Sequence, residues 1–319
     1  MRPPVTMPGR AKPRGAILAR GTRDERRAAR QGTKLERRSG RVEKRYDKAL
    51  YKFFTYLRIA GIDMPTSPYA IDETLVAYIT FLWEDGDTIG TVGDTISGMQ
   101  ARIPALRKSL PGSWLMLKAW RNKELPVQAP PLPPVLAWGL VGLALEAGFP
   151  GVACVFAVAW HCMLRTTEAF SLQASNIVLG RNTSVVTLTV TKKGLRDAVT
   201  IFDPSVTALL AQRMERLLPG DRISEVSDYQ LRQLFNSFLR DLDAHEHGFR
   251  PYSFRRGGAT HHFRTCGSMD QTCERGRWES SRTARIYITD GASQLADLHL
   301  SATCKAMCNE LARRLARSL

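Results

Sequence analysis

Apolar side chains recur at helical spacing through residues 46–122 and predict four helices. The first begins near residue 46 and ends at the Gly-Ile-Asp-Met-Pro turn of residues 61–65, and the second spans residues 72–83. Two more are predicted over residues 91–110 and 112–122. The positions expected to form the buried faces of the first two helices are Tyr51, Phe53, Phe54, Leu57 and Ile59, then Leu75, Tyr78, Ile79, Phe81 and Leu82.

A proline-rich segment separates this helical module from the rest of the chain. Residues 125–134 contain five prolines, which cannot continue a helix and favour an extended, semi-rigid linker. We therefore expect two folded domains, residues 46–124 and residues 135–319.

The second domain combines helical periodicity with one stretch of alternating β-branched residues. Residues 184–191 predict a strand, and residues 198–202 are its expected partner across the turn at 192–197. The surrounding pattern predicts helices, so the expected fold class is mainly α with a small antiparallel β-sheet. The helices are predicted over residues 135–147, 151–163, 204–217, 227–245, 253–266, 280–288 and 302–319.

Positive charge is concentrated at the start of the chain. The 319 residues have a formal net charge of +16, and residues 1–50 carry 16 Lys or Arg against 5 Asp or Glu. A basic surface attracts polyanions, so DNA, RNA and an anionic membrane are candidate partners. Because residues 1–45 have few large apolar side chains, we expect a disordered basic arm that binds nucleic acid. A solvated or nuclear-targeting tail and an organellar transit peptide are the alternatives.

The composition argues against several other classes of protein. No run of 18 apolar residues is free of charge or proline, so neither a transmembrane helix nor a signal-peptide core is expected. The six cysteines lie mostly within helical patterns, which is typical of reduced thiols in an intracellular protein. A zinc site at His261, His262 and Cys266 is the alternative, but no paired Cys-x-x-Cys spacing supports it.

Four separated motifs in the second domain contain the residue types that phosphate chemistry uses. Guanidinium and ammonium groups bind phosphate oxygens, an indole N–H donates a hydrogen bond, and a phenol becomes a nucleophile when it is activated. Taken singly, each motif has a plainer interpretation as an ion pair, a solvated hairpin, a helix-start arginine or a core aromatic residue. In chain order they are Arg165 with Glu168, Lys192 with Lys193, Tyr252 with Arg255, and Trp278 with Tyr287.

Together these motifs resemble the catalytic signature of the tyrosine recombinase (phage integrase) family. Arg-x-x-Glu, a lysine in a β-turn 27 residues later, Tyr-Ser-Phe-Arg-Arg-Gly-Gly and Trp-x8-Tyr keep the order and spacing of that signature. The resemblance covers residues 135–300, and it extends to residues 46–124 only in size and helicity. It implies a catalytic domain preceded by a helical core-binding domain, with the two domains clamping duplex DNA and the linker acting as their hinge.

The resemblance also implies roles for individual residues. Arg165 and Arg255 would hold the non-bridging oxygens of the scissile phosphate, where their charge opposes that of the pentavalent transition state. Glu168 would orient this site. Lys192 would be the general acid that protonates the departing 5′ oxygen, with Lys193 as the alternative.

Tyr287 corresponds to the family's nucleophile, which would form a 3′-phosphotyrosyl link, and Trp278 to its histidine or tryptophan beside the phosphate. Family members need no metal or other cofactor, because guanidinium groups supply the positive charge. One position departs from the pattern: Tyr252 stands where the family usually has histidine, which puts general-base assistance in doubt. His261 and His262 lie two turns further along and are expected to be packing or surface residues.

The function implied is that of a DNA strand-exchange enzyme, a site-specific recombinase or integrase from a mobile element, a virus or a host. We expect it to bind double-stranded DNA as a homo-oligomer, a tetramer, and to be intracellular, nuclear in a eukaryote and otherwise cytoplasmic or nucleoid-associated. A catalytically silent DNA-binding protein and a type IB topoisomerase-like enzyme are the alternatives. The expected DNA contacts are Lys193, Arg196 and Arg256 in the catalytic domain and Arg26, Arg27, Arg37 and Arg38 in the arm.

The C-terminal helix predicted over residues 302–319 is amphipathic. In recombinases of this type such a helix often docks onto the neighbouring subunit. Packing on its own domain is the alternative. Its expected apolar face contains Ala306, Leu311, Leu315 and Leu319.

Overall fold

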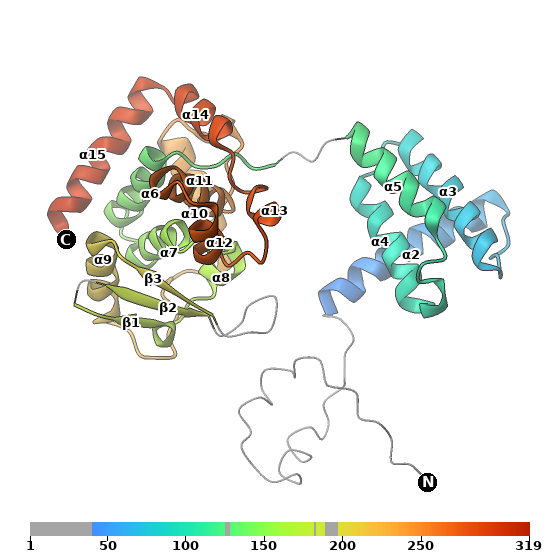
Figure 1. Cartoon of the computed structure of the whole chain (residues 1–319), viewed down its shortest axis with the longest axis horizontal. Coiled ribbons are helices and arrows are strands. Elements are labelled where there is room, and N and C mark those ends of the chain that lie inside the picture. Colours follow the sequence, from blue (N-terminus) through green and yellow to red (C-terminus); the bar gives the residue numbers. More distant parts are fainter. Residues whose placement is uncertain (1–39, 125–127, 182, 189–196) are drawn as a thin grey trace, which may run out of the picture. The chain divides into compact units, whose positions relative to one another are not determined.

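The computed structural model describes residues 40–124, 128–181, 183–188 and 197–319, which form two compact units (Figure 1). Residues 40–124 make up one unit, and the described residues from 128 onward make up the other. Each unit has a hydrophobic core of its own. The expected fold class, mainly α with a small antiparallel sheet, is confirmed. No helix in the described part of the chain is long and apolar enough to cross a membrane.

Four α-helices form the described part of the first unit. The helix predicted over residues 91–110 ends at Arg102, because Pro104 has no N–H with which to continue it, and a 3-10 turn follows at Pro104–Leu106. The four helices are α2 (Gly40–Ala60), α3 (Pro68–Glu84), α4 (Ile89–Arg102) and α5 (Pro111–Lys123).

Side chains at the helix ends fix how these helices meet. The hydroxyl of Ser67 caps α3 by accepting a hydrogen bond from the Ala70 N–H at 3.1 Å. The buried carboxylate of Asp72 accepts bonds from the N–H groups of Gly112 and Ser113, both at 2.8 Å. This carboxylate therefore satisfies the free N–H groups that begin α5 and joins α5 to α3.

The predicted buried faces of α2 and α3 were wider than the faces that the structure buries. Phe53 and Leu57 lie in the core of the unit, as do Leu75, Tyr78, Ile79 and Leu82. A four-helix unit of this size buries only the narrow stripe along which each helix meets its neighbours. The predicted core positions that are exposed are Tyr51, Phe54, Ile59 and Phe81.

The second unit is built around α7 (Pro150–His161), whose residues 151–160 are all buried. Helices α6, α9 and α11 pack around α7 and cover it on every side. This explains why the segment is apolar throughout rather than on one stripe. The other helices are α6 (Pro134–Glu146), α8 (Thr166–Phe170), α9 (Pro204–Met214), α10 (Asp228–Asp241), α11 (Ser253–Cys266), α12 (Met269–Gly276), α13 (Ser281–Ala284), α14 (Asp290–His299) and α15 (Ala302–Ser318).

A three-stranded antiparallel sheet lies at one end of this unit, in the order β1 (Ile177–Leu179), β2 (Ser184–Leu188), β3 (Asp197–Ile201). The predicted pairing of the second and third strands is confirmed, with Val186 opposite Val199. Strand β1 and helices α12 and α14 were not predicted. A strand of three residues is too short to show alternation, and α12 buries only Thr272 and Gly276, so it has no apolar stripe.

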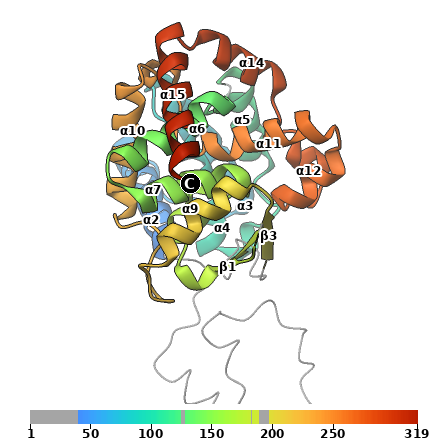
Figure 2. The ribbon, with the colours of Figure 1, turned by 90° about the vertical axis from the view of Figure 1, so that its left-hand side faces the viewer.

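The C-terminal helix α15 lies along α6 of its own unit (Figure 1). The two helices approach closely: a Cβ atom added at Gly139 would lie 2.4 Å from the Sγ of Cys308. Figure 2 shows the end of α15 beside α9, where the Nε2 of Gln212 donates to the Ser318 carbonyl at 3.1 Å. Packing on its own domain, one of the two expectations, is what this structure contains. The buried face is formed by Cys304, Cys308, Leu311 and Leu315, whereas Ala306 is exposed.

Candidate active site

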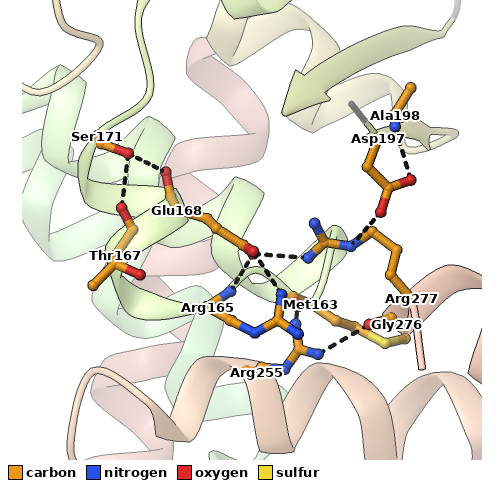
Figure 3. Close-up of polar contacts among 10 residues, drawn as sticks. All are labelled: Met163, Arg165, Thr167, Glu168, Ser171, Asp197, Ala198, Arg255, Gly276 and Arg277. Atoms are coloured by element: carbon orange, nitrogen blue, oxygen red, sulfur yellow. Dashed lines mark hydrogen bonds and ion pairs between the residues drawn. The ribbon is translucent and has the colours of Figure 1, made fainter. Parts of the chain in front are cut away.

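The turn between α7 and α8 places Arg165 and Glu168 together (Figure 3). Arg165 is the N-cap residue of α8, and the Glu168 carboxylate reaches back to it. Oε2 accepts a hydrogen bond from the Arg165 backbone N–H at 2.9 Å, and Oε1 accepts one from Nη1 at 2.7 Å. The sequence predicted two side chains on one helical face. Instead the carboxylate caps the helix start, a position that the helix dipole favours for negative charge.

Arg255 lies in the first turn of α11 and is fully buried. Its Nη1 donates to the carbonyl of Met163, and its Nη2 donates to the carbonyl of Gly276 at 2.9 Å. Burial, together with the nearby charges of Arg165 and Arg277, lowers the pKa of Arg255 to about 10. The guanidinium group therefore still carries its charge at neutral pH.

The rings of Trp278 and Tyr287 cover this guanidinium group. Its carbon atom lies 4.8 Å from the Trp278 ring centre and 5.1 Å from the Tyr287 ring centre, and the two rings lie 4.8 Å apart. Both contacts fall within cation–π range. Gly276 makes room for this stack, because a Cβ atom there would lie 2.0 Å from the Trp278 ring. The Trp278 Nε1–H is buried and has no hydrogen-bond partner among the described residues.

Tyr252 contacts Tyr287, with ring centres 5.9 Å apart. Burial raises the pKa of Tyr287, but the Tyr252 hydroxyl and the positive charges of Arg255 and Arg165 outweigh it, so the net direction is downward. Burial raises the pKa of Tyr252, and the contact with Tyr287 raises it further. Tyr252 is therefore the group that keeps its proton, and Tyr287 is the phenol that ionises more readily.

Arg277 belongs to this cluster although the sequence analysis did not name it. Its Nη2 donates to Oε2 of Glu168 at 2.9 Å, and its Nε lies 3.9 Å from Oδ2 of Asp197 at the start of β3. Figure 3 shows the Glu168 carboxylate between Arg165 and Arg277. The signal available in the sequence was its place directly before Trp278, the first residue of the Trp-x8-Tyr motif.

The remaining predicted residues divide into three groups. Arg256 is buried rather than presented to a ligand, because its Nη1 donates to Gln128 Oε1 at 2.6 Å and its Nη2 to Thr289 Oγ1 at 3.4 Å. His261 packs on the ring of Trp160, and His262 pairs with a threonine hydroxyl. Predictions for the others lie outside the described residues: Lys192, Lys193, Arg196, Arg26, Arg27, Arg37 and Arg38.

Within the part of the chain that the structure describes, no group of three His, Cys, Asp or Glu side chains is placed to hold a metal ion. The cluster is instead built from guanidinium groups around one carboxylate, with two phenols beside them. Such an arrangement can bind a phosphate-sized anion and can lower the pKa of a phenol.

Comparison with solved structures identifies the fold. The chain is similar to the integrase of the Tn1549 transposon in complex with transposon right-end DNA, with a TM-score of 0.58, 8% identity, and 86% and 97% of the two chains covered. It is also similar to a lambda integrase dimer bound to a COC′ core site, with a TM-score of 0.54, 14% identity, and 84% and 94% covered. A third is the XerH site-specific recombinase bound to a palindromic difH substrate, with a TM-score of 0.52, 14% identity, and 81% and 79% covered.

No family model and no curated protein matches the sequence itself. The chain therefore has the fold of the tyrosine recombinases, at sequence identities that show the fold alone. The resemblance stated from the motifs and the likeness in three dimensions agree on that fold.

Proposed function

We propose that this protein is a tyrosine recombinase that cuts and rejoins DNA through Tyr287. The observation that carries the proposal is the convergence of Arg165, Arg255, Trp278 and Tyr287, from three separate segments, on one partly buried cluster of positive charge. A fold can be kept without an activity, so the proposal depends on this cluster and not on the fold.

The guanidinium groups of Arg165 and Arg255 would bind the non-bridging oxygens of the scissile phosphate, that of Arg255 once the Tyr287 ring that covers it has moved aside. Arg165 is more than a quarter exposed at its side chain and can meet the ligand directly. Arg255 is held from behind by two carbonyl oxygens, so its orientation is set before DNA binds. The free indole N–H of Trp278 supplies a further donor beside them.

The Tyr287 oxygen would attack phosphorus, forming a phosphotyrosyl bond as the bond to the 5′ oxygen breaks. The phenol proton passes to water, and the departing oxygen takes a proton from the general acid, for which Lys192 is our candidate. Tyr252 does not replace the family's histidine as a base, because its own pKa is raised. We infer that it donates a hydrogen bond to the Tyr287 oxygen and so favours the phenolate.

DNA binding and assembly are parts of the same proposal. The solved structures to which the chain is similar include complexes with DNA, and one is a dimer. Double-stranded DNA is therefore the partner we propose, with the basic residues 1–39 supplying contacts to its backbone. A homo-oligomer, a tetramer, on two duplexes is the proposed active form, within the cell.

A nicked duplex tests the chemistry, because loss of the short fragment beyond the cut traps the covalent intermediate. The wild-type protein should give a protein–DNA band that survives denaturation, and Tyr287→Phe should abolish it. Tyr229→Phe is the matched control, because Tyr229 is exposed on α10, away from the cluster. DNA binding without a covalent band in the wild type would contradict the proposal and support a catalytically silent binder, the alternative that Tyr252 favours.

A topoisomerase-like enzyme would form the same covalent intermediate as a recombinase. The DNA products of the reaction distinguish the two. Relaxation of supercoiled DNA of any sequence by a monomer, with no joining of two duplexes, would support the topoisomerase-like enzyme. Strand exchange that requires a defined site would support the recombinase.

A further inference from the structure

Arg277 occupies a backbone position that does not suit arginine. It is the C-cap residue of α12 with φ of +58°, in the left-handed region, where a residue other than glycine costs about 1 kcal/mol. Four non-glycine residues in the described part of the chain have positive φ, and two of them, Met163 and Arg277, border the cluster. Backbone strain of this kind persists where the side chain is needed.

The guanidinium group of Arg277 is also buried with little compensation. The side chains of Arg277 and Glu168 are only 7% and 4% exposed, and they make one hydrogen bond with each other. The Nε and Nη1 groups of Arg277 are buried and have no hydrogen-bond partner among the described residues. A buried charge with unused donors destabilises a fold, which favours a functional reason for keeping it.

The balance of charge in the cluster suggests that purpose. Arg165, Arg255 and Arg277 carry three positive charges against the carboxylates of Glu168 and, 3.9 Å from Arg277, Asp197, which leaves a net charge of +1. Attack of a phenolate on a phosphodiester gathers two negative charges in the pentavalent transition state. Without Arg277 the net charge would fall to zero, and Glu168 would be balanced by Arg165 alone, which would draw that guanidinium group away from the phosphate.

We propose that Arg277 is a positioning residue for the reaction: it neutralises Glu168, so that the charge of Arg165 is left to the phosphate. This inference rests on the proposed function. The Nε of Arg277 also lies 3.9 Å from Oδ2 of Asp197, the first residue of β3. Arg277 thereby joins α8 and the start of β3 to the segment that carries Trp278 and Tyr287. Figure 3 shows its contacts with Glu168 and Asp197.

The test is the variant Arg277→Gly. Glycine suits the left-handed cap and so offsets part of the stability lost with the Glu168 ion pair; the variant should stay folded, with a thermal midpoint below that of the wild type. Its single-turnover rate of covalent-complex formation on saturating nicked duplex should fall about 10²-fold, with the Kd for DNA changed less than about threefold. Arg277→Lys should restore part of the rate, because it restores the charge without the planar fork.

Arg213→Gln is the matched control, since Arg213 is another half-buried arginine of this unit, paired with Glu225. Cleavage by Arg277→Gly at the wild-type rate, or an equal loss in Arg213→Gln, would overturn the assignment.

A second readout does not depend on cleavage. Titration of the Glu168 carboxyl group by carbon NMR should give a higher pKa in Arg277→Gly than in the wild type, and Arg277→Lys should lower it again. If the wild type forms no covalent adduct, the proposed function fails, and this titration still decides whether Arg277 supplies the opposing charge to Glu168. An unchanged Glu168 pKa in the glycine variant would overturn the assignment.

Discussion

The reactivity of the candidate site depends on a few residues whose pKa values are moved in opposite directions. Tyr252 and Tyr287 are identical side chains, yet burial and their mutual contact raise the pKa of the first, while neighbouring guanidinium groups lower that of the second. Two phenols whose pKa values are moved apart in this way can take different roles: the one with the higher pKa donates a hydrogen bond, and the one with the lower pKa can act as a nucleophile. In the proposed mechanism, the tyrosine at position 252 therefore changes how Tyr287 would be activated.

The variant Tyr252→Phe tests this division. It removes the hydroxyl that favours the Tyr287 phenolate, so the Tyr287 pKa should rise. Because the proposed cleavage needs the ionised phenol, the rate rises with pH up to that pKa, and the variant's rising limb should move to higher pH. The rate at pH 7 should then fall about tenfold and recover in alkali. Single-turnover cleavage of the nicked duplex across pH measures it.

Tyr229→Phe, which removes an exposed phenol, should leave the pH profile where it is. A Tyr252→Phe profile that coincides with that of the wild type would mean that Tyr252 only packs against Tyr287.

The packing of helices against one another determines where the residues of the candidate site lie. Helix α7 is buried along its length, and α11 crosses it so closely that a Cβ atom at Gly258 would lie 2.2 Å from the Trp160 carbonyl oxygen. This contact holds the start of α11, with Arg255, against the end of α7, where Met163 accepts its hydrogen bond. The C-terminal helix α15 covers α6 on the other side of this unit (Figure 2).

Gly142→Ala tests the contact between α6 and α15. The added Cβ atom would lie 2.8 Å from the Leu311 carbonyl oxygen, so backbone must shift. We expect a loss of about 1–3 kcal/mol of unfolding free energy, measured by urea denaturation. Gly291→Ala is the control, because nothing lies within 4 Å of its added Cβ atom in α14, and its stability should be unchanged or slightly higher. Equal stability of the two variants would show that α15 does not pack tightly on α6.

At the scale of the whole molecule, most of the excess positive charge and the residues of the proposed active site lie in different parts of the chain. Residues 1–39 contain 12 Lys or Arg against 3 Asp or Glu, whereas the proposed chemistry depends on a few arginines between residues 165 and 277. Non-specific attraction to a polyanion and selective binding of one phosphate can therefore be separated experimentally.

Deletion of residues 1–39 makes that separation. The cut belongs before Gly40, because α2 begins there and Arg45 forms an ion pair with Asp94 within the first unit. The slope of log Kd against log salt should become shallower, by about 0.9 for each DNA phosphate that the arm no longer neutralises, while cleavage at low salt persists. Fluorescence anisotropy over a salt series measures the slope. An unchanged slope would remove the arm from the DNA-binding surface.

Much of the fold and part of the site could be predicted because the signals are local. Helical periodicity and proline placement located most helices, and alternation located β2 and β3. The segments that were missed, β1, α12 and α14, are short or bury few apolar side chains. The buried face of α2 was also predicted to be wider than it is, because the sequence of a helix does not show how many other helices pack against it.

What the sequence determined by itself is the set of reactive residue types, their order and their local settings. It identified Arg165, Glu168, Arg255, Trp278 and Tyr287 because each stands in a motif with fixed spacing. The tertiary structure alone decided which of these groups meet, because contacts between distant segments depend on how helices pack. Packing turned Arg256 inward, brought Tyr252 against Tyr287, laid α15 on its own domain and placed Arg277, an arginine in a glycine-like conformation, beside the buried carboxylate of Glu168.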